Sequence, residues 1–205
     1  MESKNEINNN GYDYVDLGLP SGTLWATMNV GASKPSESGL YFQWGDIKGY
    51  TKEQVGKDKQ FNWNDYKWSI DGSYSNFSKY TAKDATLNLE DDAANFYMGG
   101  DWHMPSYVQI KELIENTIST RTTLDDVSGR LFVSKKDTSK YIFIPAAGLA
   151  WDGGVYISGN TGNVWSSMTS QYKASYGLYL YFNLAYAHLC IDNRCYGRSV
   201  RGVIG

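Results

Sequence analysis

The chain has 205 residues, of which 20% are charged, and its formal net charge is -3 at pH 7. This length fits one domain with a buried core, and the slight negative charge without a Lys/Arg cluster argues against a nucleic-acid-binding protein. We expect no membrane insertion, because no segment approaches the ~20 apolar residues of a transmembrane helix, and no signal peptide, because the start of the chain is polar.

The first half of the chain predicts short strands and one long loop. Residues 1–11 are polar and rich in Asn, which predicts a flexible tail. Tyr12–Leu17 and Thr23–Asn29 flank a Pro-Ser-Gly turn and predict a hairpin, and Gly39–Asp46 predicts another strand or a tight aromatic crossing. Residues from about 47 to 85 show little periodicity, so we expect a surface insertion. The aromatic residues expected to anchor it are Phe61, Trp63, Tyr66 and Trp68.

Two helices are predicted in the middle of the chain. Leu89–Asp92 places carboxylates where a helix dipole favours them, and Gly99 and Gly100 would end that helix. Ser106 and Gln109 have the spacing of a capping box at the start of the second helix. An apolar stripe follows, formed by Ile110, Leu113 and Ile114.

Strands dominate the sequence after these helices. Further strands are expected at Arg130–Ser134, Tyr141–Ile144 and Val155–Ser158, separated by turn residues. The order of strands, two helices and then many short strands predicts an α+β fold, with mostly antiparallel pairing. We expect a single domain from residue 12 to residue 205.

The segment Trp165–Gly205, the C-terminal tract, alternates most clearly between apolar and polar positions, as two half-buried strands would. The apolar set, which we expect to face the core, is Leu178, Leu180 and Phe182, then Ala187, Leu189 and Ile191. The opposite set is Tyr179, Tyr181, Asn183, Tyr186, His188, Cys190 and Asp192. This second set mixes aromatic, acidic, imidazole and thiol groups, so we interpret it as a display surface.

The composition of the tract supports a recognition role. Tyr and Trp suit binding surfaces, and the chain has 17 Tyr and 7 Trp. From Ala174 onward Glu, Gln, Lys, Met, Trp, Thr and Pro are missing, and most outward positions hold residues that adenine changes in an Asn codon would produce. The residues that we expect to bind a ligand are Tyr172, Tyr176, Tyr179, Tyr181, Tyr186, His188, Cys190, Asp192, Asn193 and Tyr196.

Segments along most of the chain carry recognisable motifs. They are Tyr14–Ala32, Tyr41–Asp46, Leu89–Ser106, Ile144–Gly148, Trp165–Ser167 and Gly197–Val203. In this order they resemble the Fibrobacter succinogenes major paralogous domain of gut Bacteroidales and their phages. The most specific features are GG-x-W-x-MP-[ST] before a helix and the terminal SVR. Three positions depart from the usual pattern, namely Met28, His103 and Gly202.

The resemblance implies a C-type-lectin-like fold with its termini close together and the C-terminal tract as the ligand-facing surface. The chain also resembles a related group, the variable proteins of diversity-generating retroelements, in which adenine-directed mutagenesis rewrites this tract. A non-catalytic phage tail adhesin or cell-surface binder is therefore expected, on a virion or outside the cell. Its partner would be a protein or glycan on a cell surface, and an oligomer is left open. An undiversified carbohydrate- or surface-binding module is the alternative.

No catalytic residue, metal site or cofactor is expected. Trp63–Asp65 spells the calcium-binding tripeptide of sugar-binding C-type lectins, but its usual Glu-Pro-Asn or Gln-Pro-Asp partner does not occur, so we interpret it as coincidence. Asp91 and Asp92 are explained by helix capping without a metal.

Cys190 and Cys195 give a more distant alternative. Their C-x4-C spacing is similar to the copper-binding pair of formylglycine-generating enzymes, which share this broad fold. Free thiols are the simpler interpretation. His103 is expected to pack beside Trp102, and the arginines near the C-terminus to be held by carboxylates or carbonyls.

Overall fold

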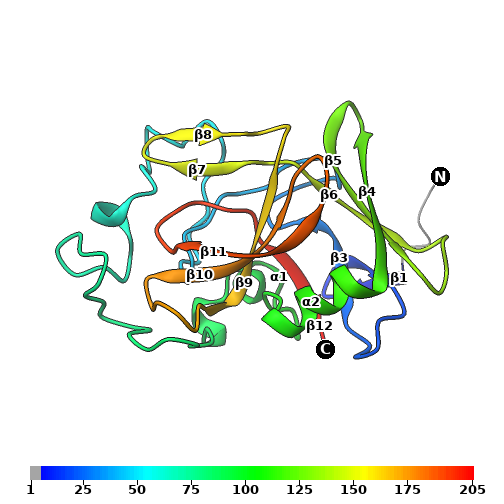
Figure 1. Ribbon diagram of the computed structural model, residues 1–205, viewed down its shortest axis with the longest axis horizontal. Helices are drawn as coiled ribbons and strands as arrows, with labels where there is room; N and C mark the ends of the chain where they lie inside the picture. The colour runs from blue at the N-terminus through cyan, green and yellow to red at the C-terminus, as the bar shows by residue number, and fades with distance from the viewer. Residues whose placement is uncertain (1–5) are drawn as a thin grey trace.

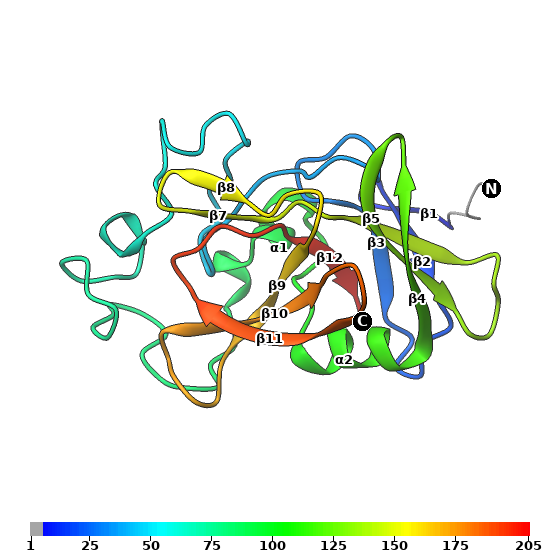
Figure 2. The same ribbon diagram turned by 45° about the horizontal axis from the view of Figure 1, so that its top comes forward.

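Short antiparallel strands make up most of the fold, together with two α-helices (Figures 1 and 2). The computed structural model describes residues 6–205, with side chains from residue 10. The predicted α+β class is therefore confirmed. Every strand pair within the four sheets is antiparallel.

A four-stranded sheet joins the two ends of the described chain. Its strands, in order across the sheet, are β1 (Glu6–Asn9), β2 (Tyr12–Asp16), β3 (Leu24–Asn29) and β12 (Arg201–Ile204). The predicted hairpin is thus confirmed. The tail expected over residues 1–11 needs correction, because residues 6–9 pair with β2, while residues 1–5 lie outside the described residues.

Both predicted helices form, with the boundaries set by their caps. A 3-10 turn, η2 (Leu89–Asp91), precedes α1 (Ala93–Met98), which begins later than predicted because Asp92 caps it. The Asp92 carboxylate accepts hydrogen bonds from the backbone N–H of Asn95 at 3.0 Å and of Met104 at 2.8 Å. The expected capping box at Ser106 and Gln109 starts α2 (Tyr107–Asn116).

Two further sheets follow α2. The three-stranded sheet contains β4 (Thr117–Leu124), β5 (Val127–Ser134) and β6 (Tyr141–Pro145), and a small hairpin contains β7 (Leu149–Trp151) and β8 (Gly154–Tyr156). Strand β4 was not predicted, because it lies at a sheet edge and most of its Thr-rich sequence faces solvent. The segment Gly39–Asp46 forms isolated bridges at Tyr41 and Phe42, so the aromatic crossing is the correct interpretation.

The first part of the C-terminal tract, with the three residues before it, builds the sheet on which the candidate site lies. Its strands are β9 (Gly162–Thr169), β10 (Tyr176–Phe182) and β11 (Ala187–Asn193), with β10 in the centre. Leu180 and Phe182 point into the main core, where they meet Ile110 and Leu113 of α2, as predicted. The helix therefore covers one end of this sheet face.

The insertion over residues 47–85 is anchored by aromatic side chains, as expected. It contains only one short 3-10 helix, η1 (Trp63–Asp65). Phe61 and Tyr66 are buried, and Tyr66 packs with Phe77 and with Cys195 of the C-terminal tract. The insertion is thus fastened to the segment that follows β11.

Candidate functional site

The two hairpins β7–β8 and β10–β11 flank the terminal segment of residues 194–200. Figures 1 and 2 show this segment running between them before it enters β12. Within the β10–β11 hairpin, Tyr179 lies opposite Cys190 and Tyr181 opposite His188. One face of this hairpin is therefore turned toward the terminal segment.

Two groups of aromatic rings lie on these three parts of the chain. Trp151 lies 5.7 Å from Tyr156 and 5.8 Å from Tyr196, measured between ring centroids. In the β10–β11 hairpin, His188 lies 5.1 Å from Tyr181 and 5.0 Å from Tyr186. We call this surface the aromatic face, and it consists of Trp151, Tyr156, Tyr181, Tyr186, His188, Cys190 and Tyr196.

The rings of the aromatic face are partly open to solvent. Trp151 is 44% exposed, Tyr156 46% and Tyr186 53%. Tyr181 and His188 are half-buried, and contacts with neighbouring rings fix their positions. Rigid aromatic groups with exposed edges have the properties of binding hot spots.

Arg198 joins the two halves of the aromatic face from beneath. Its guanidinium carbon lies 3.9 Å from the centre of the Tyr179 ring and 5.7 Å from that of Tyr196, and the side chain is fully buried. Its Nη2 donates to the Asp192 carboxylate at 2.7 Å. Asp192 therefore neutralises a buried cation, and because its side chain is 31% exposed, its ligand-binding role stays a prediction.

Tyr179 lies in the core, contrary to the prediction. It is only 7% exposed and packs edge-on against Trp165 at 5.7 Å. Burial raises the pKa of its phenol to about 12, although the Arg198 charge acts in the opposite direction. The terminal segment covers the Tyr179 face of β10, so alternation along the strand did not show which positions were free.

The two thiols have different surroundings. Cys190 Sγ lies 3.0 Å from His188 Nε2 on the edge strand, and burial raises the pKa of the thiol. Cys195 is 1% exposed and packs with Tyr66 and Phe77, where burial raises its pKa strongly. The two thiols pack in different side-chain clusters, Cys190 beside Trp165 and Tyr179, and Cys195 beside Tyr66 and Phe77.

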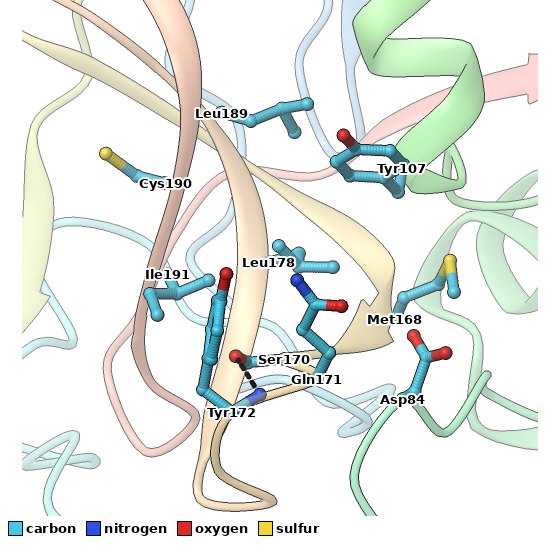
Figure 3. Close-up of a pocket in the computed structure, with 10 residues that line it drawn as sticks. All are labelled: Asp84, Tyr107, Met168, Ser170, Gln171, Tyr172, Leu178, Leu189, Cys190 and Ile191. Atoms are coloured by element: carbon cyan, nitrogen blue, oxygen red, sulfur yellow. Dashed lines mark hydrogen bonds between the residues drawn. The ribbon is translucent and has the colours of Figure 1, made fainter.

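A pocket of about 750 Å³ opens on the opposite face of the β10–β11 hairpin (Figure 3). We call it the sheet pocket. Leu178 and Ile191, which were predicted to lie in the core, line it together with Leu189, while Tyr107 and Tyr172 come from α2 and the β9–β10 loop. The core prediction for Leu178 and Ile191 was therefore wrong, because Ile191 is 36% exposed and α2 starts only at Tyr107.

A second pocket, of about 470 Å³, lies farther along the same face. We call it the basic pocket, and its lining includes Trp63, Tyr74, Lys83, Tyr172, Lys173, Tyr176 and Asn193. Tyr172 lines both pockets and is 65% exposed. Three of the predicted ligand-binding residues, Tyr172, Tyr176 and Asn193, thus lie apart from the aromatic face.

The acidic motifs singled out in the sequence serve the fold. The Asp65 carboxylate accepts hydrogen bonds from the backbone of residues 60–62 and from Gln43, so its oxygens are occupied within η1 and the surrounding loop. Asp91 accepts from Lys67, Lys79 and Tyr80, which ties the insertion to η2. Among the described residues, no group of three or more acidic, His or Cys side chains is arranged to hold a metal ion.

The structure therefore brings together five of the predicted residues on the aromatic face, namely Tyr181, Tyr186, His188, Cys190 and Tyr196. It adds Trp151 and Tyr156, which the sequence reasoning missed. The available signal was their position on either side of the Asp152-Gly153-Gly154 turn, where a hairpin would present both rings.

No family model matches this chain, and no curated protein or solved structure matches it. The resemblance described from the sequence motifs thus stays a prediction. Within residues 6–205, no helix combines the length and the apolar character needed to cross a bilayer.

Proposed function

We propose that this protein is a non-catalytic binding protein with a C-type-lectin-like fold, whose aromatic face binds a protein or glycan on a cell surface. The observation that carries the proposal is two groups of partly exposed rings, one around Trp151 and one around His188, which lie on two hairpins and the terminal segment. Tyr, Trp and His supply large contact areas at a small cost in side-chain entropy.

The scaffold beneath the aromatic face supports a further part of this proposal, that the tract is diversified. Arg198 and Arg201 are fully buried, and Arg201 donates to Asn29 Oδ1 and to the carbonyl oxygens of Ala26 and Phe143 at 2.9–3.0 Å. These contacts fix the backbone through residues outside the aromatic face. Its half-buried and exposed positions could then change identity with little loss of folding free energy.

Binding to whole cells tests the role of the aromatic face. Fluorescently labelled protein would be applied to a panel of gut bacterial cells and to a glycan array, as wild type and as the triple variant Trp151→Ala, Tyr181→Ala, Tyr186→Ala. We expect the variant to lose at least tenfold in affinity, while Phe96→Ala, which removes a 61% exposed ring from α1, binds normally. Unchanged binding by the triple variant would refute the assignment.

Amplicon sequencing of the 3′ end of the gene from its native population tests diversification. We expect adenine-linked substitutions at Tyr181, Tyr186, His188 and similar outward positions, with Leu180 and Arg198 unchanged. A uniform sequence would refute diversification and leave a fixed carbohydrate- or surface-binding module. The lining of the basic pocket favours this module as the second candidate function.

A further inference from the structure

The basic pocket forms a second site that is separate from the aromatic face. Tyr176 and Asn193 are register partners in the β10–β11 hairpin, and both line the pocket. They belong to the same alternating set as Leu178, which points into the sheet pocket, whereas Tyr179 and Tyr181 belong to the other set. The two sites therefore occupy opposite faces of one hairpin.

Two lysines line the basic pocket, although the chain as a whole carries a net charge of -3. Lys83 and Lys173 are exposed, and neither takes part in an ion pair among the described residues. None of the described lining residues is acidic. Asp84 follows Lys83 in the sequence but lines the sheet pocket instead. An anion entering the basic pocket would thus meet two ammonium groups that have no carboxylate partner, and the Lys173 ammonium lies 5.2 Å from the centre of the Tyr176 ring.

A third cation lies behind the wall of the basic pocket. Arg194 is fully buried, and its guanidinium carbon lies 4.1 Å from the centre of the Phe77 ring, which lines the pocket. Its Nη1 donates to the carbonyl oxygen of Tyr80 at 2.9 Å, but Nε and Nη2 have no hydrogen-bond partner. Since no carboxylate among the described residues pairs with Arg194, its charge adds to the attraction for anions.

The rest of the lining selects the kind of anion. Trp63, Tyr74, Tyr172 and Tyr176 provide aromatic surface, and Tyr74 is 70% exposed. The C–H faces of pyranose rings pack on such rings, while hydroxyl and amide groups in the lining, such as that of Asn193, suit sugar hydroxyls. A volume of about 470 Å³ exceeds what a bare sulfate or phosphate needs.

We propose that the basic pocket binds an acidic saccharide, in which a carboxylate or sulfate contacts Lys83 and Lys173 and the sugar ring packs on Tyr172 or Tyr176. This inference does not depend on the aromatic face, because none of the residues of that face lines the basic pocket. Cys190 borders the sheet pocket instead.

Calorimetric titration with paired saccharides tests the charge requirement. The first pair is trigalacturonate and its neutral methyl ester. Lactose is the neutral partner of both 3′-sialyllactose and lactose sulfate. The three charged ligands distinguish uronic, sialic and sulfated saccharides. At least one charged saccharide is expected to bind ten or more times more tightly than its neutral partner, with affinity falling as salt rises. Binding of none of them, or equal binding of charged and neutral partners, would overturn the proposal.

Variants locate that binding at the pocket. The double variant Lys83→Gln, Lys173→Gln should lose at least tenfold in affinity for the charged saccharide, whereas Lys52→Gln, an exposed lysine outside both pockets, should not. All these positions are exposed, so circular dichroism should show an unchanged fold. Full affinity in the double variant, or equal binding of a poly-glutamate peptide, would contradict an acidic-saccharide site.

The same titrations separate this inference from the proposed function. The aromatic-face variant Tyr181→Ala, Tyr186→Ala should bind the acidic saccharide normally, and the lysine variant should still bind cells through the aromatic face. Loss of saccharide binding in the aromatic-face variant would place the saccharide on that face instead and would refute the basic pocket.

Discussion

Replacing Tyr179 with Ala tests how the C-terminal tract is buried. The ring is 7% exposed, packs on Trp165 and lies 3.9 Å from the Arg198 guanidinium carbon. Truncation of a buried aromatic side chain removes packing and leaves a cavity, which costs about 3–5 kcal/mol. The substitution would also remove one of the aromatic rings that contact the buried Arg198 guanidinium. For a chain of this size, the loss corresponds to a fall in Tm of roughly 6–20 °C.

Thermal and urea unfolding, followed by circular dichroism, measure this effect. Tyr186→Ala is the matched control, because its ring lies in the same hairpin but is 53% exposed, so its free energy of unfolding should change by less than about 0.5–1 kcal/mol. If Tyr179→Ala unfolded within 1 kcal/mol of the wild type, the ring would not be part of the core. The display surface would then include Tyr179, as the alternation alone suggests.

Two further expectations concern buried polar groups. Asp91→Asn should lower the free energy of unfolding by about 1–2 kcal/mol at pH 7. Burial raises the pKa of Asp91, but hydrogen bonds from Lys79 and Tyr80 lower it overall. Its stabilising effect is therefore present above the unfolded pKa of about 3.9 and is lost as pH falls through the lower folded pKa, so urea unfolding should show a smaller difference at pH 3. A constant difference would contradict this. The Cys195 thiol should resist a disulfide reagent until urea unfolds the chain, and Cys190 should react slowly; rapid labelling of both would show that they are accessible.

Local patterns in the sequence predicted the local structure well. The capping box at Ser106 and Gln109 fixed the start of α2, and the alternation of Leu180 and Phe182 placed two side chains in the core. These features depend on residues a few positions apart, whose contacts the sequence itself specifies.

The face assignment within the C-terminal tract failed where distant segments decide burial. The alternation of β10 separates two sets of side chains but does not show what covers each set. Arg198, which follows β11 in the chain, packs on the Tyr179 ring and buries it. On the other face, α2 begins at Tyr107 and leaves Leu178 lining the sheet pocket. Each face of the sheet is therefore buried at some positions along its strands and exposed to solvent at others.

This arrangement explains how one hairpin could carry two independent binding surfaces. Arg194 and Arg198 leave the same segment of the chain, yet Arg194 packs under the basic pocket and Arg198 under the aromatic face. Each guanidinium is buried against rings, and only Arg198 pairs with a carboxylate. Because Asp192 neutralises Arg198 while Arg194 has no such partner among the described residues, the positive charge remains at the pocket side. The aromatic face then favours neutral contacts, whereas the basic pocket favours anions.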